Sequence, residues 1–198
     1  MIYPQIKTYL EKATSVEITD ARKSILNEIV EYIKSAEDPK LNFICTHNSR
    51  RSHLSQIWAQ TMAHHYGVKV ETYSGGTEAT AFNANAVAAI ESAGFGVIKG
   101  EGSNPRYKVK FSDGVPPMIC YSKTFDDDVN PGSDFAAIMT CSEADAECPI
   151  VFGADARIKL FYEDPKVSDG TGNEEKVYGE RSGQIAAEMA YVFSQVKS

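Results

Sequence analysis

Short apolar segments alternate with amphipathic segments in the first half of the chain, and this alternation restricts the fold more than any other feature. The run LNFIC (41–45) has the composition of a buried strand, and VKVETYS (68–74) alternates as a strand does. Between them, apolar residues recur at helical spacing from Leu54 to Ala63, and a second helix is predicted over 83–95. Strands that alternate with helices predict an α/β domain with a parallel sheet.

The remaining segments predict additions around this domain. Residues 1–40 are interpreted as two helices that pack, as an extension, on a main domain of residues 41–198. Two alternating runs around Ser-Asp-Gly and two prolines predict an inserted β-hairpin at about 100–131. The segment 133–141 predicts another strand, and apolar residues at helical spacing predict a C-terminal helix.

Composition and charge exclude several classes of protein. The chain has 198 residues, a net charge of −7 and a pI near 5.1, which disfavours a nucleic-acid partner because such proteins need a basic surface. No apolar run approaches the length of a membrane span, and the first residues lack the pattern of a signal peptide. We therefore expect a cytoplasmic protein that binds neither nucleic acid nor membrane.

The cysteines suggest chemistry rather than structural cross-links. The four of them are Cys45, Cys120, Cys141 and Cys148. In a cytoplasmic chain, cysteines are more often catalytic, redox-active or buried than joined in structural disulfides. Zinc fits poorly because no second pair at ligand spacing accompanies Cys141 and Cys148, and we predict no metal. The apolar surroundings of Cys120 predict a buried, inert thiol.

The stretch FICTHNSRRSHLSQ (43–56) places a thiol between a predicted strand and a predicted helix. The start of a helix and a nearby arginine both favour a thiolate, and Ser52 is placed to cap the helix or to support the sulfur. Backbone N–H groups of the intervening residues can converge on a tetrahedral oxyanion, and Arg51 can add a two-pronged contact. The predicted binding loop consists of Thr46, His47, Asn48, Ser49, Arg50, Arg51 and Ser52. The alternative is a buried cysteine at a strand end beside surface arginines, since short motifs recur by chance.

The motif CTHNSRRS resembles the phosphate-binding loop of the low-molecular-weight protein tyrosine phosphatases and of the thioredoxin-coupled arsenate reductases that share their fold. The resemblance implies a three-layer sandwich with a central, mostly parallel four-stranded sheet. It also implies that Cys45 is the nucleophile, that Asn48 shapes the loop, that Arg51 holds the oxyanion and that Ser52 supports the thiolate.

Two further segments bear on which activity is present. CSEADAECP (141–149) resembles the cysteine pair of the arsenate reductases, which ordinary phosphatases of this fold lack. A disulfide needs Cα atoms about 4.4–6.8 Å apart, so a helix between Cys141 and Cys148 would have to bend or unwind. In LFYEDPK (160–166), proline holds the preceding residue extended, and the family pattern makes Asp164 the general acid. Asp-Pro alone is also a common turn.

The resemblance implies an arsenate reductase with a Cys45–Cys141–Cys148 relay, no bound cofactor, and thioredoxin as the external reductant. The alternative is a phosphatase that hydrolyses phosphomonoesters through a Cys45 phosphoenzyme. A third possibility is an oxyanion-binding or redox-sensing protein whose added segments recruit a partner.

The sequence also departs from the family at three positions. His47 replaces a common glycine. Arg50 replaces a second cysteine and either adds positive potential or points to solvent. Gln56 stands where an acidic residue helps some relatives bind potassium, so that ion is not predicted.

Overall fold

The computed structural model describes residues 1–147 and 150–197. The elements are α1 (Pro4–Ala13), α2 (Asp20–Ser35), β1 (Lys40–Cys45), α3 (Arg51–Tyr66), β2 (Glu71–Gly76), α4 (Ala84–Ser92), β3 (Gly96–Ile98), β4 (Tyr107–Lys110), β5 (Met118–Cys120), β6 (Phe135–Met139), α5 (Ser142–Glu147), β7 (Ala154–Lys159), the 3-10 helix η1 (Pro165–Ser168) and α6 (Glu174–Lys197). None of the helices within these described residues is long and apolar enough to cross a membrane.

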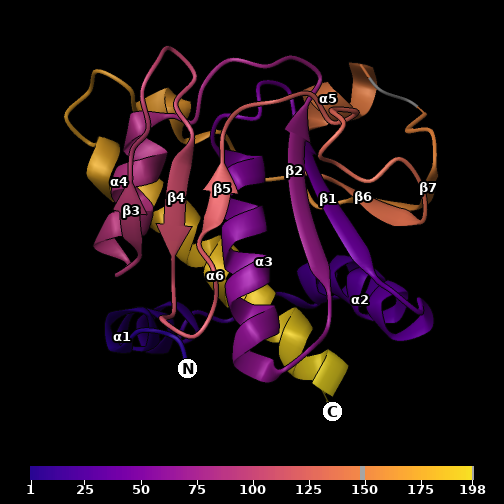
Figure 1. Cartoon of the computed structure of the whole chain (residues 1–198). Helices are drawn as coiled ribbons and strands as arrows, with labels where there is room; N and C mark the ends of the chain where they lie inside the picture. The colour runs from indigo at the N-terminus through magenta and orange to yellow at the C-terminus, as the bar shows by residue number, and fades with distance from the viewer. Residues whose placement is uncertain (148–149, 198) are drawn as a thin grey trace.

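The main sheet has four strands, all parallel, in the order β2-β1-β6-β7 (Figure 1). The predicted central, mostly parallel four-stranded sheet is therefore present, and the order of its strands comes from the structure. β1 lies inside the sheet, and its register against β6 runs from Leu41 opposite Ala136 to Ile44 opposite Met139. A strand with neighbours on both sides and layers on both faces is buried throughout, which explains the mainly apolar run LNFIC. Its polar residue, Asn42, is buried and donates to the carbonyl oxygen of Phe125 at 3.1 Å. The sheet therefore brings the residues that follow β1 and β6 to one edge.

The two faces of the main sheet pack against different layers. Phe43 points into a large hydrophobic cluster that includes the buried faces of α2, α3 and α6. The neighbouring Ile44 points the other way, into a smaller cluster with Met139, Val151 and Ala144 of α5. The alternation follows from the pleat of the strand, in which successive side chains point to opposite faces.

The predicted hairpin is present, but it is part of a larger sheet. β4 and β5 pair in antiparallel fashion, with Tyr107 opposite Cys120, and β3 adds a third strand to β4. The prediction of a two-stranded insertion was therefore incomplete. β3 spans three residues, Gly96–Ile98, and so short a strand carries no detectable alternation. In Figure 1 this second sheet lies on the side of α3 away from the main sheet.

The two N-terminal helices form where the apolar spacing placed them. Leu26, Ile29 and Ile33 of α2 are buried in the same cluster as α3 and α6. Tyr9 of α1 stacks on Trp58 of α3 with ring centroids 5.5 Å apart. These helices share the core of the rest of the chain, and the domain boundary after residue 40 stays a prediction.

Candidate active site

Two of the predicted cysteines meet at the carboxyl edge of the main sheet. Cys45 is the last residue of β1, and Cys141 follows β6, the parallel neighbour of β1. Parallel neighbours end at the same edge, so both thiols belong to one buried cluster, with exposed fractions of 3% and 0%. Strand pairing thus joins two motifs that lie about a hundred residues apart in the sequence.

The loop after Cys45 turns its carbonyl groups outward. The carbonyl oxygen of Cys45 accepts from Thr77 N at 3.1 Å, and that of Thr46 accepts from Glu78 N at 2.9 Å. The carbonyl oxygen of His47 accepts from Ser122 Oγ at 2.9 Å, and that of Ser49 accepts from Asn83 N at 2.9 Å. In a planar trans peptide, the carbonyl group and the following N–H group point in opposite directions. The following N–H groups therefore face the centre of the loop. Within the described residues, no backbone N–H group from 46 to 50 has a hydrogen-bond partner, so the loop offers several donors to an anion.

Asn48 and Ser52 support the Cys45 sulfur. The Asn48 amide donates to Ser52 Oγ at 2.9 Å, and Ser52 Oγ lies 3.0 Å from Cys45 Sγ. Because Ser52 Oγ accepts from Asn48, its own hydrogen is available for a hydrogen bond to the sulfur. Asn48 itself has φ = 42°, in the left-handed region that asparagine tolerates. Lys123 N donates to Asn48 Oδ1 at 3.0 Å and so orients the amide.

The prediction that Ser52 caps α3 was wrong. The helix begins at Arg51, and the residue at its N-cap, Arg50, makes no side-chain capping bond. Ser52 lies within the first turn, where its hydroxyl is turned toward the thiol. The uncapped helix start leaves N–H groups free for an anion in the loop.

His47 takes an ordinary backbone conformation, although the family resemblance led us to expect a glycine there. Apart from glycine, the described residues with positive φ are Asn48 and Asp134. The left-handed turn therefore falls on Asn48, and His47 needs no glycine-like freedom. The side chain of His47 is 43% exposed, and its Nε2 lies 3.3 Å from Glu78 Oε1 at the rim of the site.

Arg51 and Asp164 face each other beside the loop. Arg51 is 7% exposed, and its Nη2 lies 2.9 Å from Asp164 Oδ2. Arg51 Nη1 donates to the carbonyl oxygen of Tyr162 at 3.2 Å, while Arg51 Nε is buried without a partner. Asp164 has extended backbone angles before Pro165, as predicted, and caps η1 by accepting from Lys166 N at 3.0 Å. The carboxylate is thus held at the site by a turn as well as by the arginine.

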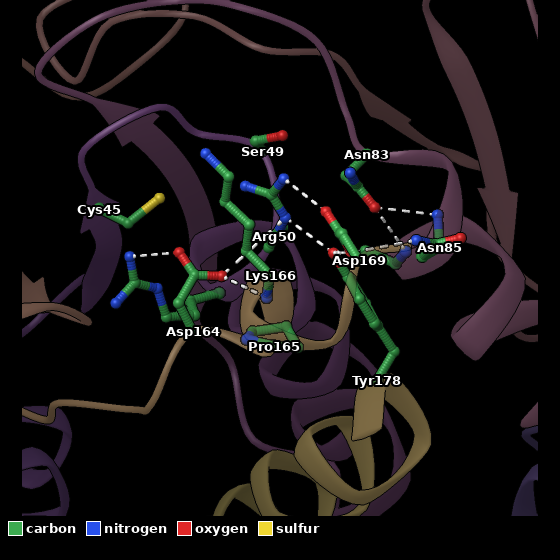
Figure 2. A network of polar contacts seen from close by, with 12 residues as sticks. Cys45, Ser49, Arg50, Asn83, Asn85, Asp164, Pro165, Lys166, Asp169 and Tyr178 are labelled. Atoms are coloured by element: carbon green, nitrogen blue, oxygen red, sulfur yellow. Dashed lines mark hydrogen bonds and ion pairs between the residues drawn. The ribbon is translucent and has the colours of Figure 1, made fainter. Parts of the chain in front are cut away.

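Arg50 also turns toward this carboxylate and does not point to solvent. Its Nε donates to the Tyr178 hydroxyl at 2.9 Å and lies 3.9 Å from Asp164 Oδ1. Its Nη2 lies 3.4 Å from Asp169 Oδ2, and Tyr178 donates to Asp169 Oδ1 at 2.8 Å. Burial, and then the bond to Asp169, raise the pKa of Tyr178. Figure 2 shows this network running from Asp164 through Arg50 to Asp169.

Cys141 lies beside the loop as a buried thiol. Its Sγ is 3.5 Å from Thr46 Oγ1 and accepts a weak hydrogen bond from Ala144 N at 3.4 Å. Burial raises the pKa of Cys141, and the contacts with Thr46 and Ala144 oppose that rise. Glu147 accepts from Thr77 Oγ1 at 2.8 Å, which ties the end of α5 to the loop region. The predicted third member of the relay, Cys148, lies outside the described residues.

Several residues that build the site were not predicted. A side chain at Gly76 would place its Cβ 2.6 Å from Asn48 N, and one at Gly75 would lie 2.2 Å from the Cα of Phe125. The paired glycines at the end of the neighbouring strand, β2, were a detectable signal of this close approach. Tyr162, Asp169 and Tyr178 carried no such signal, because their contacts span more than a hundred residues or arise from helix packing. No group of three His, Cys, Asp or Glu side chains within the described residues is placed to hold a metal ion.

A thiol at the base of a ring of inward N–H groups, beside a buried arginine and a carboxylate, defines a nucleophilic oxyanion-binding site.

No protein-family model matches the chain. An arsenate reductase from Bacillus licheniformis is 28% identical to it over 139 residues, covering 70% of this chain and 83% of the relative. An arsenate reductase from Bacillus subtilis is 27% identical over 145 residues, covering 73% and 87%.

Solved structures of low-molecular-weight phosphatases share the fold. The solution structure of such a protein tyrosine phosphatase from Bacillus subtilis matches with a TM-score of 0.53 and 15% identity, covering 80% of this chain and 97% of the other. The phosphatase from Vibrio cholerae matches with a TM-score of 0.52 and 12% identity, covering 78% and 94%. The chain therefore has the fold of the low-molecular-weight phosphatases, and its sequence relatives are arsenate reductases. The family resemblance drawn from CTHNSRRS is confirmed.

Proposed function

We propose that this protein is an arsenate reductase in which Cys45, Cys141 and Cys148 pass the oxidation to thioredoxin. The observation that carries the proposal is a second buried thiol, Cys141, held 3.5 Å from Thr46 of the oxyanion loop. A phosphatase needs one thiol at this site, whereas a reductase needs a second thiol that can reach the first.

The first step is nucleophilic attack on arsenate in the loop. The Cys45 thiolate forms a sulfur–arsenic(V) bond, and an arsenate oxygen leaves as water with a proton from Asp164. The inward N–H groups of residues 46–50 and Arg51 stabilise the charge on the remaining oxygens. Arg51 Nε, which is buried without a partner, is an available donor for this purpose.

The second step reduces arsenic. The Cys141 thiolate attacks Cys45 Sγ, so a sulfur–sulfur bond forms and the electron pair of the sulfur–arsenic bond stays on arsenic. Arsenic(V) becomes arsenic(III), arsenite leaves, and the two cysteines are oxidised to a disulfide. Cys148 then attacks Cys141, forms a Cys141–Cys148 disulfide and releases the Cys45 thiolate. The two thiols of thioredoxin reduce that disulfide and are oxidised in turn.

The rim of the site favours a small inorganic oxyanion. Most of the residues that Figure 2 shows around Arg50 and Asp164 are polar or charged, among them Ser49, Asn85 and Lys166, whereas Pro165 and the ring of Tyr178 are buried. An aryl phosphate would gain binding energy from aromatic or apolar walls, which these side chains do not offer. Arsenate requires only the loop and the arginine.

The test is NADPH oxidation by the reduced protein with arsenate, thioredoxin and thioredoxin reductase. We expect arsenate-dependent oxidation that is lost in Cys141→Ser and in Cys148→Ser. In a single turnover with arsenate, Cys148→Ser should stop with one Cys45–Cys141 disulfide, which peptide mass spectrometry identifies.

Cys120→Ala is the matched control. Cys120 is fully buried, burial raises its pKa to about 12, and it lies in the other hydrophobic cluster, away from Cys45. This variant should retain arsenate-dependent oxidation. Hydrolysis of para-nitrophenyl phosphate without any arsenate-dependent NADPH oxidation would refute the reductase and favour a phosphatase.

A further inference from the structure

Arg50 reaches both ends of η1, the short helix that follows the carboxylate of the site. Asp164 lies at the start of η1, and Asp169 follows its end. Arg50 Nε lies 3.9 Å from Asp164 Oδ1, and Arg50 Nη2 lies 3.4 Å from Asp169 Oδ2. One guanidinium, carried by the neighbour of Arg51 in the oxyanion loop, is therefore joined to the whole segment 164–169 (Figure 2).

The attachment at Asp169 is the firmer of the two. The Tyr178 hydroxyl accepts from Arg50 Nε at 2.9 Å and donates to Asp169 Oδ1 at 2.8 Å. Asn85 Nδ2 donates to the same oxygen at 3.2 Å. Tyr178 is buried, the side chain of Arg50 is 13% exposed, and hydrogen bonds to charged groups are the stronger and more directional ones. Asp169 is thus fixed by side chains from α4, from α6 and from the start of α3.

The hold on Asp164 loosens when the site is in use. In the structure, Arg51 Nη2 lies 2.9 Å from its carboxylate. In the reaction proposed above, Arg51 turns its donors to the oxyanion, and a protonated Asp164 no longer forms an ion pair. A proton donor has to stay within hydrogen-bond reach of the departing oxygen. Another contact must therefore keep the segment 164–169 against the loop at that moment.

We propose that Arg50 is the positioning residue for Asp164, because it clamps the segment 164–169 onto the oxyanion loop while Arg51 holds the oxyanion. This inference rests on the proposed function, in which Asp164 supplies the proton. Arg50 acts through that segment, since its Nε and Nη2 are directed at Tyr178 and Asp169. The planar fork of arginine suits the task, because one side chain bonds to two partners in fixed directions.

The leaving group of a phosphomonoester measures how well Asp164 delivers its proton. Phenyl phosphate releases a poor leaving group that needs the proton, whereas ortho,para-dinitrophenyl phosphate releases a stable anion that does not. In Arg50→Met, kcat/KM for phenyl phosphate should fall at least about tenfold more than kcat/KM for the dinitrophenyl ester. A general loosening of the loop would lower both values alike.

Three further variants separate geometry from charge. Arg50→Lys keeps the charge but loses the fork, so most of the selective loss should remain. Tyr178→Phe removes only the hydroxyl between Arg50 and Asp169, keeps the packing of the ring, and should show a smaller loss of the same kind. Arg106→Gln is the matched control, because Arg106 lies over Tyr121, away from this network, and both kcat/KM values should stay unchanged.

Exchange of the Lys166 amide with solvent gives a measurement that needs no turnover. This amide donates to Asp164 Oδ1 at 3.0 Å, so its exchange, followed by NMR, should be at least about threefold faster in Arg50→Met. Unchanged exchange, an equal loss for the two esters, or full recovery in Arg50→Lys would each overturn the inference. The selective loss without any arsenate-dependent NADPH oxidation would support the inference and refute only the reductase.

Discussion

Arg22 of the N-terminal helix α2 holds a buried carboxylate in the core of the molecule. Its Nε and Nη2 donate to the two oxygens of Glu188, at 2.8 and 2.9 Å, and its Nη1 donates to the carbonyl oxygen of Phe161 at 2.9 Å. The side chains of Arg22 and Glu188 are 17% and 3% exposed. Tyr162 also donates to Glu188, at 2.7 Å, and its carbonyl oxygen accepts from Arg51. The pair therefore secures the segment that leads to the active site.

We predict that Arg22→Met lowers the free energy of unfolding by about 3 kcal/mol. Removal of one partner of a buried ion pair costs about 3–5 kcal/mol, because the other charge stays buried without compensation. The lower end applies here because Glu188 keeps the bonds from Tyr162 and from Gln184 Nε2, the latter at 3.0 Å. Urea unfolding followed by circular dichroism measures the change.

The double variant Arg22→Met/Glu188→Gln provides the control. It removes both charges, so it should recover about 1–2 kcal/mol of the loss seen in Arg22→Met alone. Turnover at saturating arsenate should also fall in Arg22→Met, because Tyr162 then positions Arg51 less firmly. A loss of stability under 1 kcal/mol in the single variant, or no recovery in the double variant, would refute this reasoning.

Three further predictions concern the site. Because burial holds the pKa of His53 well below its ordinary 6.5, the unfolded chain gains a proton below about pH 6.5 that the folded chain does not. The free energy of unfolding should then fall by up to ~1.4 kcal/mol for each pH unit of acidification below about pH 6.5. In His53→Gln, urea unfolding at a series of pH values should show a weaker dependence of this free energy on pH. Gly76→Ala should lose about 2 kcal/mol and most activity, because its Cβ would lie 2.6 Å from Asn48 N; a stable, active variant would contradict the loop packing. Burial raises the pKa of Cys141, so closure of the first disulfide in single turnovers should accelerate with pH up to at least pH 9, and a plateau below pH 8 would contradict it.

The parts of the site that adjoin in the chain were predictable from the sequence. Strand, thiol loop and helix follow one another within residues 40–66, so their apolar spacing and the loop motif could be interpreted together. Asp164 was predicted from the proline beside it and from the family pattern, and the structure places it 2.9 Å from Arg51. The four parallel strands also follow from the alternation and the resemblance, because parallel strands need helical connections.

The capping role predicted for Ser52 shows where local pattern fails, whereas the family resemblance had predicted its contact with the thiol. Serine before an apolar helical stretch is a common capping signal, and that preference reflects the backbone alone. Here the hydroxyl is occupied by the thiol of Cys45 and the amide of Asn48 together, and both reach it through the curled loop. The outcome depends on three-dimensional placement, which spacing in the chain does not describe.

Contacts between distant segments required the folded structure. Arg50 meets Tyr178 across 128 positions, Arg22 meets Glu188 across 166, and Lys123 reaches Asn48 across 75. Polar pairs of this kind have no periodicity, because they depend on how helices and sheets pack rather than on the conformation of either segment. The nucleophilic loop could therefore be located from the order of the residues. The way in which the carboxylates, the N-terminal helices and the second sheet surround that loop was decided only by packing in the folded structure, because these contacts join segments that lie far apart in the sequence.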